Sequence, residues 1–114
     1  MNECLFCKMV RSEIKSDMVL ETDDLIAFRD INPQAPVHIL VVPRKHISTL
    51  NDLIPAEAEL VGKLVLAARE IAQRERIAAS GYRLVMNCNK GAGQTVFHIH
   101  LHLLGGRVMA WPPG

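Results

Sequence analysis

Three histidines lie at every second position near the end of the chain, in the segment His98-Ile99-His100-Leu101-His102-Leu103-Leu104. Side chains of a β-strand alternate between its two faces, so a strand here would carry the imidazoles on one face and the apolar side chains on the other. The chain has only five histidines, and three of them in one row are better explained by chemistry than by an ordinary polar surface. The pattern predicts a strand with one face in the core and one face in a reactive site.

Metal binding and nucleophilic catalysis are the two functions that such a row can serve. A strand rises ~3.3 Å per residue, which places the first and third histidines ~13 Å apart, whereas a zinc–nitrogen bond is ~2 Å long. One ion does not easily bind all three, although two neighbours ~6.6 Å apart could share an ion with ligands from elsewhere. We favour a reactive role for the central residue, His100, because a neutral imidazole of pKa ~6.5 is a competent nucleophile at pH 7.

A glycine-containing connector precedes these histidines, with Gly91, Gly93, Gln94 and Thr95 in close succession. Glycine permits unusual dihedral angles and close approach of a ligand to backbone N–H groups, and the hydroxyl of Thr95 adds a donor. The connector could therefore bind a phosphate. Two glycines are also ordinary turn chemistry, so the interpretation depends on the neighbouring imidazoles.

The elements that position these residues follow from the apolar pattern. A one-face apolar pattern with acidic residues at its start and basic residues at its end predicts a long helix over residues 55–76. Period-2 and β-branched runs separated by turn residues predict strands. We expect a short helix over 5–13 and strands over 18–21, 25–29, 37–42, 82–87 and 98–104. This order favours an α+β fold with a mostly antiparallel sheet and helices to one side.

The composition excludes several classes of protein. The 114 residues show no shift in composition, which predicts a single domain over residues 1–114. A net charge of +1 with dispersed basic residues argues against nucleic-acid binding. No apolar run approaches the ~18 residues of a membrane span, and the start of the chain lacks the pattern of a secretory signal. We therefore expect a cytoplasmic protein with no nucleic-acid or membrane partner.

Cysteines in a cytoplasmic chain are expected to be thiols or metal ligands rather than disulfides. Cys4 and Cys7 form a C-x2-C pair, whose spacing suits two thiolates on one ion. Cys88 stands alone, and we interpret it as a small buried hydrophobic residue.

These residues and their spacing resemble the histidine triad (HIT) family of nucleotide hydrolases, whose signature is His-x-His-x-His followed by two apolar residues, and within it the Hint branch. The resemblance extends beyond this signature. Residues 28–38, 43–47, 91–102 and the tail 105–114 all look like Hint segments in the expected order. It thus covers nearly the whole chain.

The resemblance implies a HIT-like α+β fold, in which a five-stranded, mostly antiparallel sheet carries one long and one short helix. Two protomers would form a homodimer with a continuous ten-stranded sheet. Each protomer would bind a purine nucleotide, and Trp111 would approach the partner's active site.

The implied activity is hydrolysis of nucleoside 5′-phosphoramidates, such as AMP joined to an amine, and of acyl or aminoacyl adenylates. Carried over, His100 would attack the α-phosphate, and His102 and His38 would assist the phosphate and its proton network. A covalent nucleotidyl-histidine avoids direct attack by water. His102 and the glycine loop would stabilise the phosphate charge. No magnesium motif is evident, so we expect no magnesium requirement.

The resemblance also assigns the nucleotide-binding residues by the part of the nucleotide that each would contact. The base would lie against Phe6, Ile14, Phe28 and Ile31; Asp30 would hold the ribose hydroxyls; and Asn87, Gly93, Gln94, Thr95, His100 and His102 would surround the phosphate and the adjoining sugar.

A structural zinc site is implied as well. Some family members of bacterial type carry a cysteine pair with two histidines, which here would give zinc bound by Cys4, Cys7, His46 and His98. Hint proteins without the cysteines also have histidines at these two positions, so the histidines add little independent support.

Three positions depart from the family pattern. Lys15 stands where proline is common, and Thr95 replaces a serine but keeps the hydroxyl. Ala110 replaces a more polar residue of animal relatives, a change that could alter the preference for the leaving group.

Two other functions stay open. One alternative is a dinucleoside polyphosphate hydrolase of the sister branch, which would be expected to lack the ending at residues 111–114. The other is a nucleotide-binding scaffold with vestigial activity.

Overall fold

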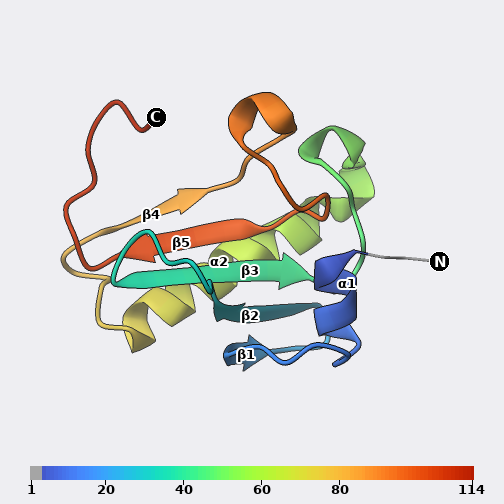
Figure 1. Ribbon diagram of the computed structural model, residues 1–114, viewed down its shortest axis with the longest axis horizontal. Helices are drawn as coiled ribbons and strands as arrows, with labels where there is room; N and C mark the ends of the chain where they lie inside the picture. Colours follow the sequence, from blue (N-terminus) through green and yellow to red (C-terminus); the bar gives the residue numbers. More distant parts are fainter. Residues whose placement is uncertain (1–3) are drawn as a thin grey trace.

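A five-stranded antiparallel sheet with the strand order β1-β2-β3-β5-β4 forms the centre of the computed structural model, which describes residues 4–114 (Figure 1). One short and one long helix accompany the sheet, so the predicted α+β class and antiparallel arrangement are confirmed. The elements are α1 (Leu5–Val10), β1 (Met18–Glu21), β2 (Leu25–Arg29), β3 (Val37–Pro43), α2 (Ala58–Arg74), β4 (Tyr82–Val85) and β5 (Leu101–Gly105).

The helices are shorter than the sequence pattern predicted. α1 ends at Val10, and Ser12 soon after it has a positive φ of 60°, outside the helical region. α2 begins at Ala58 because residues Pro55–Glu57 form a separate 3-10 turn, in which the Glu57 carboxylate accepts a hydrogen bond from the Ile54 N–H at 2.9 Å. The strand predicted over 82–87 ends at Val85.

The histidine segment is only partly a strand, which corrects the prediction of a continuous strand over 98–104. β5 begins at Leu101, so only His102 of the three histidines lies in it. Its partner β3 ends at Pro43, which has no N–H to extend the ladder. The Ile99 N–H instead donates to the Ile47 carbonyl in the loop after β3, at 2.8 Å.

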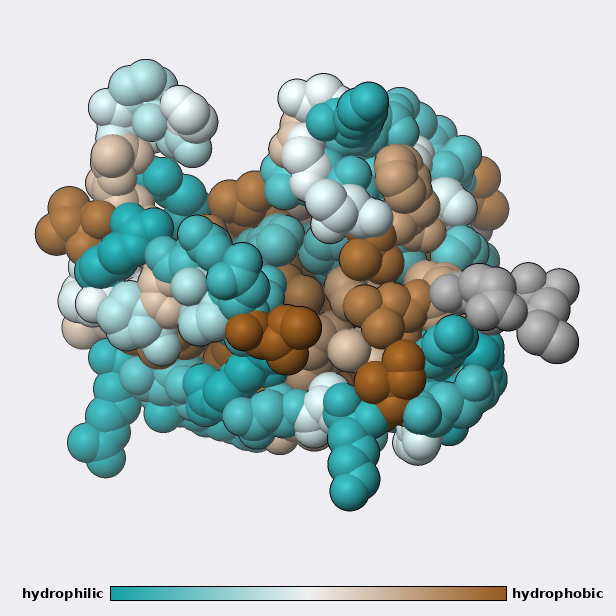
Figure 2. Space-filling model, in the orientation of Figure 1, coloured by the Kyte–Doolittle hydropathy of each residue, from teal (hydrophilic) through white to brown (hydrophobic). Residues whose placement is uncertain are grey.

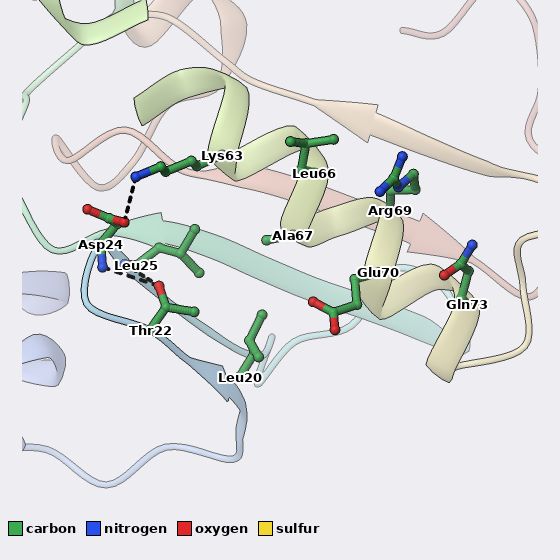
Figure 3. A pocket seen from close by; sticks show the side chains of 10 residues that line it. All are labelled: Leu20, Thr22, Asp24, Leu25, Lys63, Leu66, Ala67, Arg69, Glu70 and Gln73. Atoms are coloured by element: carbon green, nitrogen blue, oxygen red, sulfur yellow. Dashed lines mark hydrogen bonds and ion pairs between the residues drawn. The ribbon is translucent and has the colours of Figure 1, made fainter. Parts of the chain in front are cut away.

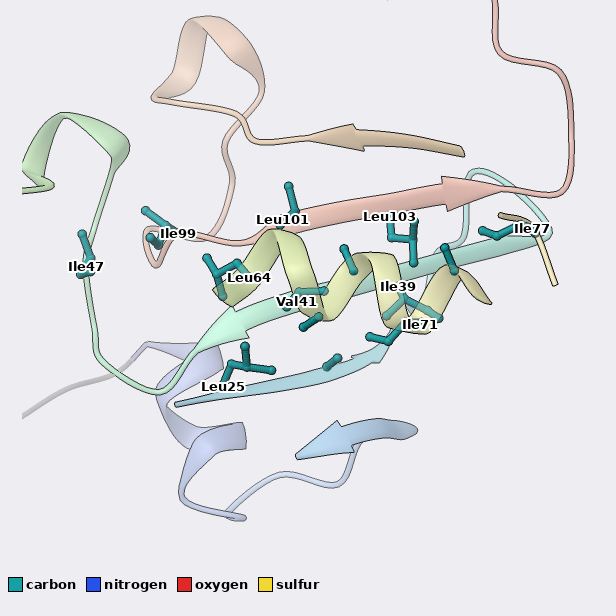
Figure 4. Packing of buried hydrophobic residues seen from close by; sticks show 14 residues of the cluster. Leu25, Ile39, Val41, Ile47, Leu64, Ile71, Ile77, Ile99, Leu101 and Leu103 are labelled. Atoms are coloured by element: carbon teal, nitrogen blue, oxygen red, sulfur yellow. The ribbon is translucent and has the colours of Figure 1, made fainter. Parts of the chain in front are cut away.

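The predicted alternation of the histidine segment holds despite this change in backbone. Ile99, Leu101 and Leu103 are all buried in the main core. They point toward α2, as Figure 4 shows, where Leu64 and Ile71 pack against them. The imidazoles are therefore directed away from the α2 side of the sheet.

α2 covers one face of the sheet with its apolar side. Its buried residues are Leu64, Ala67, Ala68, Ile71 and Ala72, and fully burying a leucine or isoleucine side chain stabilises a fold by about 1.5–3 kcal/mol. None of the helices in the described part of the chain is both long and apolar enough to cross a membrane. The cytoplasmic location stays a prediction.

α1 covers one end of the opposite face. The register pairs Phe28 with Leu40 and Leu40 with His102, so these three side chains share that face. Phe6 of α1 packs on it together with Ile26, Phe28, Leu40 and Val42. Because α1 has only six residues, it leaves the part of this face beside the histidines open.

Candidate active site and metal centre

A cavity of about 380 Å³ lies on the face that carries α1. Figure 2 shows apolar surface gathered around α1 on this face, with hydrophilic surface at its edges. The lining of this cavity combines the aromatic rings of Phe6 and Phe28 with the imidazoles of His100 and His102, which suits a molecule with a flat ring and a charged group. Its lining residues are Leu5, Phe6, Met9, Lys15, Ser16, Asp17, Phe28, Arg29, Asp30, Ile31, Leu40, Thr95, Val96, His100 and His102.

His100 is held in one tautomer by the backbone. Its Nδ1 lies 2.8 Å from the carbonyl oxygen of His98, and because a carbonyl only accepts, Nδ1 carries the proton. The lone pair of the neutral ring is therefore on Nε2. Burial lowers the pKa of His100 below its usual 6.5, partly offset by that hydrogen bond and by Asp30. Neutral and with a free ring nitrogen, His100 has the properties of a nucleophile.

His38 and His102 form a chain of hydrogen bonds beside it. The Gln34 N–H donates to His38 Nδ1 at 3.0 Å, so neutral His38 carries its proton on Nε2, which lies 2.9 Å from His102 Nδ1. His102 Nδ1 therefore accepts, and its own proton is on Nε2. Burial, with smaller effects of His100 and His38, lowers the pKa of His102 to about 4. Neutral His102 can thus donate from Nε2 to a phosphate oxygen.

Asp30 stands next to this chain. Its Oδ2 lies 3.5 Å from His38 Nε2, and its Oδ1 accepts from the Asn32 N–H at 2.8 Å. The carboxylate opposes the burial that lowers the pKa of His38. Asp30, His38 and His102 also bring potential ligand atoms within 4.8 Å of one another, but the two imidazoles already use each other as partners.

Seven of the residues predicted to bind the nucleotide line this cavity. They are Phe6, Phe28, Asp30, Ile31, Thr95, His100 and His102. His38 lies just behind them, through its contact with His102. This grouping brings together segments that are far apart in the sequence.

Four other predicted residues do not line the cavity: Ile14, Asn87, Gly93 and Gln94. Gln94 is buried, and its amide accepts from the Asn89 N–H and donates to the carbonyls of Ser48 and Val96. Gly93 has a φ of 91°, which glycine adopts without strain. Both residues therefore shape the loop that precedes the histidines, and the nucleotide contacts assigned to all four stay predictions.

Several lining residues were missed by sequence reasoning. Leu5 and Met9 are four residues apart on α1 and flank Phe6, so helical spacing could have indicated them. Lys15, Ser16 and Asp17 lie in the connector before β1, which has no periodicity from which their position could be predicted. Cys88 also differs from the prediction, since it is half-buried rather than fully buried.

A second cluster of side chains lies on the other side of Phe6. The predicted ligand atoms of Cys4, Cys7, His46 and His98 all lie within 4.8 Å of one another. Cys4 Sγ and Cys7 Sγ are 3.4 and 3.5 Å from His98 Nδ1. His46 Nδ1 is 3.3 Å from Cys7 Sγ and 3.2 Å from His98 Nδ1.

The donor set of this cluster fits zinc. The Nε2 of His98 donates to the Pro43 carbonyl at 2.7 Å, so the lone pair of the neutral ring is on Nδ1, the atom next to the sulfurs. Burial lowers the pKa of His98, which favours the neutral form that a ligand requires. Two sulfurs and two imidazole nitrogens are a donor set typical of structural zinc.

A separate hollow lies between the β1–β2 turn and α2 (Figure 3). Leu20, Leu25 and Leu66 contribute its apolar lining, and Lys63 Nζ pairs with Asp24 Oδ2 at 3.0 Å. None of the predicted site residues lines it. This hollow is therefore separate from the cavity that His100 and His102 line.

Comparisons with known proteins agree with this geometry. A family model described as HIT domain matches residues 11–109. The purine nucleoside phosphoramidase of Escherichia coli (strain K12) is 50% identical over 105 residues, covering 92% of this chain and 88% of that protein. A crystal structure of a HIT family hydrolase from Legionella pneumophila matches with a TM-score of 0.97 and 53% identity, covering 98% of this chain and 100% of that chain. The crystal structure of a zinc-bound histidine triad family protein from Mycobacterium smegmatis matches with a TM-score of 0.81 and 31% identity, covering 92% of this chain and 76% of that chain. The chain therefore belongs to the HIT family.

Proposed function

We propose that this protein is a purine nucleoside phosphoramidase, which cleaves the bond between the phosphate of AMP and an amine or acyl group. The observation that carries the proposal is the hydrogen bond from His100 Nδ1 to the His98 carbonyl, which leaves the Nε2 lone pair of a cavity-lining imidazole for attack. The name of the Escherichia coli relative supports the same reaction.

The reaction proceeds in two steps. In the first, His100 Nε2 forms a bond to the α-phosphorus, and the bond from phosphorus to the amine breaks; the amine leaves with the bonding pair and takes a proton from solvent. In the second, water forms a bond to phosphorus, and the bond to His100 breaks. This step returns the proton to solvent, so that one water is consumed and AMP, the amine and neutral His100 result.

His102 and His38 stabilise the phosphate during both steps. The Nε2–H of His102 donates to a phosphoryl oxygen, and the His38 hydrogen bond keeps the proton on that nitrogen. Thr95 and the backbone of the preceding loop supply further donors. Because the rings of His100 and His102 are 5.0 Å apart, one phosphate can contact both.

The aromatic side chains of the cavity accommodate the purine. Phe6 and Phe28 form its wall, with ring centroids 5.6 Å apart, and the fully exposed side chain of Ile31 can close over the base. Asp30, which also lines the cavity, accepts hydrogen bonds from the ribose hydroxyls. The same proposal assigns Ile14 to the wall of the base, Asn87 to the sugar and phosphate, and Gly93 and Gln94 to the phosphate.

Zinc is proposed as a structural cofactor bound by Cys4, Cys7, His46 and His98. The clustering of their donor atoms and the zinc-bound relative from Mycobacterium smegmatis support it. Bound zinc would join the start of α1 to the loop after β3 and to the histidine segment. All four ligands come from the protein, so its role is to hold these segments together.

A homodimer with a continuous ten-stranded sheet is proposed through β4. Both β1 and β4 are edge strands, but the pairing of β1 shifts register between Met18 and Leu20, which blunts that edge. The β4 edge is regular in its pairing with β5, and the exposed side chain of Val65 on α2 offers apolar surface for the same association. Arg83 holds the C-terminal tail at the Ala110 carbonyl, and Trp111 after it is exposed and could reach a partner.

Turnover of adenosine 5′-phosphoramidate tests the proposed activity, with a diadenosine polyphosphate as the competing substrate. We expect release of AMP and ammonia from the phosphoramidate with the higher kcat/KM. Preference for the dinucleotide would instead favour the sister branch, and AMP binding without turnover of either substrate would favour the scaffold function.

A further inference from the structure

We propose that Phe6 is a positioning residue that couples the Cys4/Cys7/His46/His98 cluster to the nucleotide cavity, so that zinc and nucleotide each strengthen the binding of the other. The inference rests on the proposed zinc site and on the proposed nucleotide-binding function. The new element is an energetic coupling between zinc binding and nucleotide binding.

The ring of Phe6 lies between the two sites. Its centroid is 5.9 Å from the ring of His98 in the cluster and 5.0 Å from the ring of His100 in the cavity, with interplanar angles of 74° and 86°. It also meets Phe28 edge-on, and only 3% of Phe6 is exposed. One buried ring therefore contacts a predicted metal ligand, the predicted nucleophile and the predicted wall of the base.

The position of Phe6 depends on α1, which is too short to be stable without tertiary support. Phe6 and Cys7 are the buried residues of α1, and Cys4 and Cys7 approach His98 and His46. A metal at the cluster would thus fasten α1 on both sides of Phe6 in the sequence.

His98 provides a second connection between the sites. Its side chain belongs to the cluster, while its carbonyl accepts the hydrogen bond from His100 Nδ1. Its ring is also fixed at the Pro43 carbonyl. A metal on His98 Nδ1 would therefore restrain the same residue that orients the His100 ring.

Thermodynamic linkage makes the effect reciprocal. If zinc favours the arrangement in which Phe6 completes the cavity, nucleotide bound in that cavity must favour zinc binding by the same factor. The zinc-free protein would populate arrangements in which α1 leaves the base wall incomplete, and its apparent affinity for nucleotide would fall accordingly.

The test measures AMP affinity by calorimetry for zinc-loaded and zinc-free wild-type protein, and zinc affinity by chelator competition with and without AMP. AMP is the proposed product, so no turnover interferes. We expect AMP to bind at least about 5-fold more tightly to the zinc-loaded protein, with an equal gain in zinc affinity when AMP is present.

Two matched variants separate Phe6 from the rest of the cavity. Phe6→Leu keeps an apolar side chain and all four ligands, so it should bind zinc but lose most of the coupling factor. Phe28→Leu removes the other aromatic ring of the wall, whose ring contact is with Phe6, whereas Phe6 itself makes the ring contact with His98. It should weaken AMP binding equally in both zinc states and keep the coupling factor.

The outcomes distinguish this inference from the proposals beneath it. Tight zinc binding with equal AMP affinity in both zinc states of the wild type overturns the coupling and leaves both sites standing. Absence of zinc binding, or of AMP binding, overturns the coupling together with that site. An undiminished coupling factor in Phe6→Leu overturns the role of Phe6, and the wild-type measurements decide the coupling itself even where a variant fails to fold.

Discussion

The carbonyl oxygen of His98 accepts a hydrogen bond from His100 Nδ1 at 2.8 Å. A backbone atom two residues earlier in the chain thus decides which nitrogen of the predicted nucleophile is free. Because the acceptor is backbone, a substitution of the His98 side chain leaves it in place. The side chain of His98 is consequently available for a different role in the metal cluster.

Replacing His100 with alanine should abolish turnover of an adenosine phosphoramidate, because the variant lacks the Nε2 lone pair that would attack phosphorus. AMP binding should remain within a few-fold, since most of the cavity is formed by other residues. Rapid quench with a reactive adenylate should trap AMP on a wild-type peptide containing His100. His102→Ala should slow the reaction without removing it. An adduct on His102 would contradict the assignment.

The acid limb of the kcat/KM profile should lie below pH 6.5. Attack requires neutral His100, and burial lowers its pKa from that value. As the pH falls from 7, the ring therefore stays neutral past 6.5 and is protonated only at lower pH, where activity declines. Steady-state rates between pH 4.5 and 8, with zinc content followed in parallel, would measure this. If kcat/KM already declines above pH 6.5 while the zinc content is constant, the lowered pKa of His100 is contradicted.

One zinc per protomer should be found by elemental analysis of protein purified without added metal. Cys4→Ala and Cys7→Ala should lose the metal and unfold at lower temperature, because a ligand that binds only the folded state at a thousandfold its Kd contributes about 4 kcal/mol. Cys88→Ala is the matched control, since Cys88 lies outside the cluster. Zinc-free wild-type protein with unchanged thermal stability would remove the proposed cofactor.

Sedimentation should give twice the 12.7 kDa chain mass at micromolar concentration. Arg83→Ala should leave this mass largely unchanged while releasing the tail from its hydrogen bond to the Ala110 carbonyl. Leu84→Pro in β4 removes one backbone donor and distorts the strand, so it should yield monomer. Leu20→Pro makes the same change in β1, at the opposite edge, and should remain a dimer. If Leu20→Pro is monomeric while Leu84→Pro remains a dimer, the β4 interface is refuted.

Most of the fold could be predicted because its elements leave local patterns. The alternation of residues 98–103 indicated which side chains enter the core, and the one-face pattern of α2 indicated its length to within a turn at each end. The start of β5 could not be predicted, because it depends on where β3 stops and on the long-range bond between Ile99 and Ile47.

The site was predictable in its residue types and less so in its details. Histidines and cysteines are rare enough that their spacing carries information. The tautomers, however, are fixed by backbone atoms of His98, Gln34 and Pro43, and every residue has these atoms. The hydrogen bonds of Gln94 to peptide groups such as the Ser48 carbonyl could not be predicted either, because these groups have no sequence signature.

The alternation of residues 99–103 also determines which changes of length the chain can tolerate. Inserting or deleting one residue between Ile99 and Leu103 would reverse the facing of the side chains on one side of the change, placing an imidazole under α2 or a leucine in the cavity. The turn at Lys90–Ala92 is surface-exposed, so it can lose or gain residues at lower cost. Next to the histidine segment, length variation should therefore be tolerated better in that turn than within residues 99–103.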